Sequence, residues 1–202
     1  GRIVRLRDVE PSERAEEISK ATSKDPRLIE LILRETKSLV KASLEIVIVE
    51  NKQGLVCINA GVDKSNVEGE DAYALLPTDP DESAERIRSE IRKLTAKTVA
   101  VVVTDTYSRP FRRGQVEFAI GVAGLNPFRD YRGQKDLFDY VLRVKNTAVA
   151  DEIASAAELV MGQGGEGVPV AIIKNLKVER KENPSSTDLL ISKDEDLFRG
   201  TL

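Results

Sequence analysis

The sequence predicts an α+β fold, with mixed sheets packed against helices. Short apolar runs typical of strands lie within residues 44–61, 98–106 and 168–176, and helical patterns fall between them irregularly. This irregular order argues against a Rossmann fold, and the absence of a G-x-x-x-x-G-K-[ST] motif argues against a P-loop fold. A chain of 202 residues can bury one good-sized core or two small cores that share an interface.

The first 61 residues predict a short basic strand, two helices and a hairpin. Ser12 is a suitable N-cap for the first helix and Asp25 for the second, which has Pro26 at its first position. Residues 44–61 then form two apolar strands around a polar turn that ends at Gly54. One apolar face of the second helix is formed by Leu28, Ile29, Ile32 and Leu33.

The remaining residues predict two further long helices and two buried strands. Residues 81–97 form an amphipathic helix capped by Asp81 or Ser83, and a buried strand follows at 98–106. Residues 107–136 mix turns with a short apolar stretch. A short strand then leads into an alanine-rich helix from about Val149 to Val160, a buried strand at 168–176, and a polar tail that ends in a short helix.

The composition limits both the location and the chemistry of the protein. With a net charge of −3, the chain has no general attraction to nucleic acid, and no apolar run reaches the roughly 20 residues of a membrane span. The single cysteine, Cys57, favours a reducing compartment, so we expect the protein in the cytoplasm. The absence of histidine excludes His-based triads and His-ligated zinc, so a metal here needs oxygen ligands, as magnesium, manganese or calcium do.

Two segments that follow apolar runs carry candidate metal ligands. In TDT, Asp105 offers a carboxylate and Thr106 a hydroxyl or carbonyl oxygen. In NAGVDKSNV, Asp63 and Asn66 offer further oxygens beside Ser65. Each segment alone is explained more simply by local structure, as a strand-end turn around Asp105 and as an Asx-turn or helix cap at Asp63.

The segment SRPFRRGQ gathers three arginines directly after TDT, namely Arg109, Arg112 and Arg113. Guanidinium groups bind phosphate or carboxylate through paired hydrogen bonds, so the segment is a candidate clamp for an anionic substrate. A solvated basic turn is the alternative, and the acidic balance of the chain argues against a nucleic-acid patch. The segment DYRGQKD at 130–136 leaves a similar choice between a polar substrate site and a surface ion-pair network.

The sequence GQGGEG, residues 162–167, has the spelling G-x-G-x-x-G of a dinucleotide-binding loop but the wrong surroundings. That loop needs a strand before the glycines and a helix after them, whereas here the alanine-rich helix comes first. We interpret it as a loop whose backbone amides can approach phosphate, with Gln163 and Glu166 as further oxygen ligands. A helix C-cap with a wide turn is the alternative.

Taken together, these motifs resemble one family. The segments VCINAGVDKSNV, LLPTDPDESA, TDTYSRPFRRGQ, DYRGQKD and AVADEIASAAELVMGQGGEGVPVAII are similar, in this order, to those of the coenzyme F420:L-glutamate ligases, from about Gly1 to Lys174. The resemblance implies a family-specific ligase fold over residues 1–202, as one catalytic unit or as two intertwined subdomains. It also implies that the N-terminal segment of the family is absent from this chain.

The activity that this resemblance implies is a GTP-dependent amide synthesis. GTP would activate a carboxylate of the coenzyme F420 precursor as an acyl phosphate, and the amine of L-glutamate would then displace the phosphate. Later cycles would extend a γ-linked glutamate tail. The resemblance also implies two Mg²⁺ or Mn²⁺ ions, stimulation by K⁺, and a homodimer.

The same resemblance implies roles for individual residues in the matching motifs. Asp63 and Asp105 would bind one divalent ion, Thr106 and Gln163 a second, and Asn66 would contact GTP. The glycine-rich loop would hold the nucleotide through Met161, Gly162, Gln163, Gly164, Gly165, Glu166, Gly167 and Val168.

The resemblance also concerns the arginine segment, and the chain differs from the family pattern at two positions. Arg112 is the catalytic candidate beside the aspartates, and Arg109 and Arg113 join it in binding the anionic substrate. The family often has a carboxylate where this chain has Gln163, and because an amide oxygen is a weaker ligand we expect a weak or differently built second metal site. SRPF also replaces the commoner GRPF. A metal-dependent phosphohydrolase and a non-catalytic nucleotide-binding homologue or fragment are the alternatives to a ligase.

Overall fold

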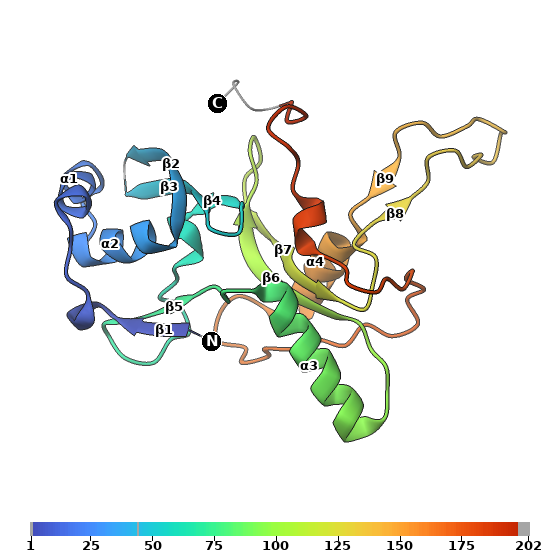
Figure 1. Ribbon diagram of the computed structural model, residues 1–202, viewed down its shortest axis with the longest axis horizontal. Helices are drawn as coiled ribbons and strands as arrows, with labels where there is room; N and C mark the ends of the chain where they lie inside the picture. The colour runs from blue at the N-terminus through green and yellow to red at the C-terminus, as the bar shows by residue number, and fades with distance from the viewer. Residues whose placement is uncertain (1, 44, 198–202) are drawn as a thin grey trace. The chain divides into compact units, whose positions relative to one another are not determined.

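The computed structural model describes residues 2–43 and 45–197, and the chain divides into two compact units. Unit 1 comprises the residues up to Thr78 together with Tyr107–Gly114, and unit 2 comprises Asp79–Thr106 and the residues from Gln115 onward. Both units contain helices and small sheets (Figure 1). The α+β fold class predicted from the sequence is therefore confirmed.

Two small antiparallel sheets form the β-structure of unit 1. Strand β1 (Arg2–Arg5) pairs with β5 (Ala72–Leu75), and β3 (Ile46–Asn51) lies between β2 (Thr36–Ser43) and β4 (Val56–Ile58). Short 3-10 turns η1 (Leu6–Asp8) and η2 (Asn59–Gly61) follow β1 and β4. The β3–β4 hairpin confirms the prediction, whereas β2 was not predicted because its residues are mostly exposed and mark no apolar run.

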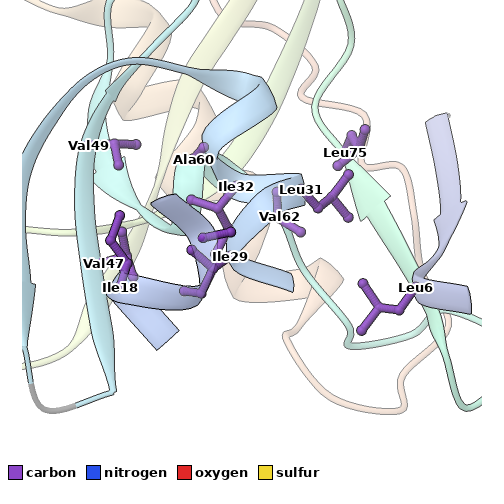
Figure 2. Packing of buried hydrophobic residues seen from close by; sticks show 11 residues of the cluster. Leu6, Ile18, Ile29, Leu31, Ile32, Val47, Val49, Ala60, Val62 and Leu75 are labelled. Atoms are coloured by element: carbon purple, nitrogen blue, oxygen red, sulfur yellow. The ribbon is translucent and has the colours of Figure 1, made fainter. Parts of the chain in front are cut away.

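The two helices of unit 1, α1 (Glu13–Thr22) and α2 (Pro26–Glu35), begin at the caps that the sequence indicates. The Ser12 hydroxyl accepts the N–H of Ala15 at 3.3 Å, and the Asp25 carboxylate accepts the N–H of Arg27 at 2.8 Å. The apolar face of α2 packs onto the sheet and η2 (Figure 2). The core of unit 1 includes Leu6, Ile18, Ile29, Leu31, Ile32, Val47, Val49, Ala60, Val62 and Leu75.

Unit 2 is built around β7 (Gln115–Ala123), against which α3 (Pro80–Thr95) and α4 (Val149–Met161) both pack. β7 pairs with β6 (Val101–Ser108), and β8 (Arg129–Asp130) pairs with β9 (Asn146–Thr147). The unit 2 core comprises Ala119, Val122, Leu125, Val149 and Ala150. The sequence predicted α4 closely but indicated only a short apolar stretch where β7 lies.

The start of α3 differs in detail from the prediction. Its N-cap is Asp79, whose carboxylate accepts the N–H of Glu82 at 2.8 Å, rather than Asp81 or Ser83. Asp81 instead accepts the N–H of Val122 at 2.8 Å and so joins α3 to β7. A side chain at Gly121 would collide with the carbonyl oxygen of Pro80, so this close approach of β7 to the helix requires glycine.

The later apolar runs of the sequence are the least well predicted. Residues 168–176 form no strand, contrary to the prediction, and their side chains are exposed, with Val170 at 71% and Ile172 at 79%. Within the described chain no strand pairs with this segment, and a strand needs a neighbour for its backbone groups.

Two further elements differ in extent from the prediction. The strand predicted at 98–106 begins at Val101, continues to Ser108 and is half-buried rather than buried. The short helix of the tail is the 3-10 turn η3 (Ser186–Leu189), and the last residues of that tail lie outside the described part. None of the helices described has the length and apolar composition that crossing a membrane requires.

Candidate active site

The sequence suggested that the TDT segment lies at the end of a strand. In the structure it lies inside strand β6. Both Asp105 and Thr106 are half-buried. Because neighbouring residues of a strand project to opposite faces, the side chains of Asp105 and Thr106 lie in different surroundings. The Thr106 hydroxyl belongs to a compact group of polar side chains within unit 2.

Three side chains meet in this group, which we term the oxygen cluster: Thr106 of β6, Glu117 of β7, and Gln163 just after α4. The Thr106 hydroxyl oxygen lies 2.8 Å from Glu117 Oε1 and 2.9 Å from Gln163 Oε1. The Gln163 amide nitrogen donates to Glu117 Oε1 at 2.8 Å. The structure thus brings together the two residues assigned to a second metal ion and adds a carboxylate beside them.

Glu117 is a residue that the sequence analysis missed. Its exposed fraction is 7%, and Ser155 of α4 donates a hydrogen bond to its backbone carbonyl at 2.9 Å. The signal available in the sequence was one acidic residue within an otherwise apolar run, since an acid there is either paired or functional.

The glycine-rich loop begins as the C-terminal cap of α4. The helix ends at Met161, and Gly162 adopts a positive φ of 72° while its N–H bonds to the carbonyl of Glu158 at 2.8 Å. The carboxylate of Glu166 folds back over Gly162 and accepts the N–H of Gly164 at 2.8 Å. The loop therefore caps a helix and also presents at least one backbone amide to an anionic oxygen. Because the helix precedes the glycines, this is not a dinucleotide-binding loop of the Rossmann type.

Asp63 and Asn66 lie in unit 1, after η2. Asp63 Oδ1 accepts the N–H groups of Lys64 at 2.7 Å and Ser65 at 3.2 Å, and the Ser65 hydroxyl donates to Oδ2. This is the Asx-turn weighed in the sequence analysis. Asn66 has a positive φ of 51°. The two aspartates assigned to the first ion belong to different units, since Asp105 is part of unit 2.

The arginine segment belongs to unit 1 and is anchored at Tyr107. The Tyr107 hydroxyl donates to the carbonyl of Val56, and burial, with a smaller effect of Cys57, raises the pKa of Tyr107 to about 12. Arg109 is half-buried, and its Nε is a buried donor without a hydrogen-bond partner among the residues described. The other two arginines, Arg112 and Arg113, are exposed.

The DYRGQKD segment carries exposed ion pairs. Arg132 lies 2.6 Å from Asp130 and lowers the pKa of that carboxyl to about 2 through hydrogen bonds and charge. Lys135 pairs with Asp139 at 2.9 Å. Asp130 also lines an open pocket of about 380 Å³ together with Tyr131 and Gln134. The ion pairs favour the surface-network interpretation, and a polar substrate site at this segment stays a prediction.

The donor groups of unit 2 suit a hard divalent cation better than zinc. Across residues 2–43 and 45–197 no group of three or more histidine, cysteine, aspartate or glutamate side chains could hold a metal. A metal site built from the described residues would combine carboxylate oxygens with neutral ones, as magnesium and manganese accept. The oxygen cluster fits this requirement with one carboxylate, one hydroxyl and one amide oxygen.

Comparison with known proteins adds the family. The model of the family described as F420-0:Gamma-glutamyl ligase matches residues 1–175. The chain belongs to this family. The resemblance noted in the sequence is therefore confirmed. The matched range contains every segment on which that resemblance was based.

Named relatives of this ligase family are similar over nearly the whole chain. The coenzyme F420:L-glutamate ligase of Methanocaldococcus jannaschii is 45% identical over 199 residues, which cover 98% of this chain and 79% of the relative. The coenzyme F420:L-glutamate ligase of Methanothermobacter thermautotrophicus is 43% identical over 202 residues, covering 99% and 79%. That of Archaeoglobus fulgidus is 43% identical over 202 residues, covering 100% and 80%.

Proposed function

We propose that this protein is a ligase that joins L-glutamate to the coenzyme F420 precursor through an amide bond and so builds a γ-glutamyl tail. The observation that carries this proposal is the family match over residues 1–175, together with relatives named coenzyme F420:L-glutamate ligase that cover almost the whole chain.

The proposed reaction is driven by GTP in two steps. The terminal phosphoryl group of GTP moves to a carboxylate oxygen of the precursor, which gives an acyl phosphate and GDP. The amine of glutamate then attacks the acyl carbon, the new C–N bond forms, phosphate leaves and the amine loses a proton. Phosphoryl transfer depends mainly on positioning and on neutralising charge, so the site needs N–H donors and cations around the phosphates.

We assign the nucleotide to the glycine-rich loop and Asn66, and two Mg²⁺ or Mn²⁺ ions to the two ligand pairs, Asp63 with Asp105 and Thr106 with Gln163. Bound divalent ions would offset the charge of the triphosphate, and K⁺ would stimulate the reaction. Support for the loop comes from its Gly164 N–H, which already binds a carboxylate oxygen. Support for the second pair comes from the 2.9 Å separation of its two oxygens.

We assign the anionic substrate groups to the arginine segment, with Arg112 as the catalytic candidate and Arg109 and Arg113 beside it. The unpartnered Nε of Arg109 supports this assignment, because a buried donor without an acceptor is costly unless a ligand supplies one. A solvated basic turn would leave such a donor in water.

We also propose a homodimer that acts in the cytoplasm. Exposed apolar side chains of unit 2 support the dimer, since contiguous exposed apolar surface commonly marks an interface. They lie in the segment 168–176 and near residues 137–144, with Leu137 at 97% and Phe138 at 89%. The single free thiol of Cys57 suits a reducing compartment.

The reaction is tested by incubating the protein with GTP, Mn²⁺, L-glutamate and the coenzyme precursor. A product that carries one more glutamate, formed together with GDP, supports the ligase. Consumption of GTP without glutamate incorporation would instead support the phosphohydrolase that uses Asp63 and Asp105. Nucleotide binding without either reaction would support a non-catalytic homologue.

The assignment of Asp105 can be tested separately. Asp105→Asn removes the charge but keeps the size of the side chain, so we expect the ligase reaction to fall to background while thermal unfolding stays close to that of the wild type. Glu17→Gln, at the exposed Arg14–Glu17 ion pair of α1, serves as the control and should leave the reaction unchanged. Activity of the Asp105→Asn variant equal to the wild type would refute the metal assignment.

A further inference from the structure

Glu117 is a buried carboxylate without a cationic partner. Three buried glutamates occur among the described residues, with exposed fractions of 9% for Glu35, 8% for Glu50 and 7% for Glu117. Glu35 pairs with Arg2 and Glu50 with Lys37, each at 2.7 Å. Within residues 2–43 and 45–197 Glu117 forms no ion pair, and its hydrogen bonds come from neutral donors. Because a buried charge is costly unless it is paired or binds a metal, this position points to a cation.

The oxygen cluster also has fewer protons than acceptors. The Thr106 hydroxyl has one hydrogen, yet it lies within hydrogen-bonding distance of both Glu117 Oε1 and Gln163 Oε1. The second carboxylate oxygen, Glu117 Oε2, accepts no hydrogen bond from any residue that the structure describes. Converging oxygens with too few protons are the arrangement that a hard divalent cation satisfies.

Glu117 in addition fixes the orientation of the Gln163 amide. The amide nitrogen must face the carboxylate, since the opposite orientation would place two acceptor oxygens against each other. The amide oxygen is thereby presented to Thr106. One carboxylate thus supplies both a charge and the arrangement of two neutral oxygens.

We infer that Glu117 is the anionic ligand of the second divalent-cation site, with Thr106 and Gln163 as its neutral oxygen ligands. This inference rests on the proposed function, and it removes a difficulty in it. The sequence predicts a weak second site because Gln163 is neutral, but the neighbouring strand β7 supplies the missing negative charge.

The inference is tested by titrating the whole chain with Mn²⁺, without nucleotide, by calorimetry and by the electron paramagnetic resonance of bound Mn²⁺. Glu117→Gln should weaken the binding of one ion by roughly 10–100-fold, and Glu117→Asp, which keeps the charge, should recover part of that loss. Glu50→Gln is the matched control, because Glu50 is equally buried on a strand but pairs with a lysine. We expect Mn²⁺ binding by this control to equal that of the wild type.

Gln163→Glu is a second variant that keeps the inference testable if Glu117→Gln does not fold. It would place two carboxylates in one cluster, so we expect a lower melting temperature without metal and a larger rise on adding Mn²⁺ than the wild type shows. A melting temperature that responds to Mn²⁺ as in the wild type would contradict the inference.

Failure of the inference is distinguishable from failure of the proposed function. Mn²⁺ binding that is the same in Glu117→Gln and in the wild type, or undetectable in the wild type, overturns the role of Glu117. The ligase proposal depends instead on the incorporation of glutamate into the product, which is measured independently of these titrations.

Discussion

Asp151 shows at the residue scale how a carboxylate can serve structure. It lies in the first turn of α4, and its Oδ1 accepts the N–H of Ala119 on β7 at 3.0 Å. Burial raises the pKa of Asp151, and the hydrogen bond from Ala119 offsets only part of that rise. The carboxylate therefore joins α4 to β7, although its charge is destabilised by partial burial.

This geometry predicts different effects for two substitutions of Asp151. Asp151→Asn keeps an acceptor without the charge, so its free energy of unfolding should stay within about 1 kcal/mol of the wild type at pH 7. Asp151→Ala leaves the buried N–H of Ala119 without an acceptor and should cost about 1–3 kcal/mol. Urea denaturation measures both values. Equal losses in the two variants would show that the acceptor is unimportant.

The pH dependence has a definite sign. A carboxyl whose folded-state pKa lies above the unfolded value of about 3.9 lowers stability as the pH rises through the interval between the two. The stability of Asp151→Asn relative to the wild type should therefore be higher at pH 7 than at pH 4. Asp130→Asn is the control of opposite sign, because the lowered pKa of Asp130 means that its ion pair contributes above pH 4 and is lost as the pH falls toward 2. A higher relative stability of Asp151→Asn at pH 4 would contradict this account.

At the scale of elements, the glycine-rich loop combines two requirements. It must end α4, for which Gly162 provides a positive φ, and it must leave backbone amides accessible to phosphate. The Glu166 carboxylate accepts the N–H of Gly164, to which a phosphate oxygen of the proposed nucleotide would bind. The carboxylate and the phosphate would repel each other if both were bound to this N–H.

We therefore predict that removing this carboxylate strengthens nucleotide binding. Glu166→Ala should lower the KM for GTP by about fivefold, since one hydrogen bond and a nearby like charge together are worth about 1 kcal/mol. Glu166→Gln keeps the acceptor without the charge and should give an intermediate value. Steady-state kinetics at saturating glutamate measures both. If Glu166 is instead a metal ligand, kcat will fall in both variants and the KM will not improve.

The elements also show which parts of the fold a sequence predicts. Helix starts depend on contacts between residues two or three positions apart, so Ser12 and Asp25 were identified as caps, and the same holds for the β3–β4 hairpin. β2 was missed because its residues are mostly exposed, and β7 was recognised only as a short apolar stretch. A strand was wrongly predicted at 168–176, since an apolar run does not show whether a pairing partner exists.

The site shows the same division between local and distant information. Thr106 and Gln163 were named because their motifs are local, but no short motif includes Glu117, which reaches them only when β7, β6 and the end of α4 come together. The hydrogen-bond partners of Asp81 are likewise 41, 104 and 105 positions away in the chain, and that of Asp151 is 32 positions away. Of these, Glu117 is recognisable from the sequence, as a charge within an apolar run.

At the scale of the whole molecule, the segment 168–176 is the clearest sign of a missing neighbour. Val168, Val170 and Ile172 are all exposed, at 42%, 71% and 79%. Exposed apolar side chains that gather in one segment commonly mark an interface with another chain. The homodimer proposed above would provide that partner.

The dimer is tested by placing a charge on this segment. Ile172→Lys should convert the dimer to a monomer, because burying an unpaired ammonium at an interface is costly. The side chain is already 79% exposed within one chain, so the free energy of unfolding of the monomer should change by less than about 0.5 kcal/mol. Light scattering coupled to gel filtration measures the mass, and Leu94→Lys, at an 83% exposed position on α3, is the matched control. A dimer that persists in Ile172→Lys would exclude this segment from the interface. A wild-type chain that is monomeric at every concentration tested would refute the dimer itself, and the exposure of Val170 and Ile172 would then have to be explained by a different partner.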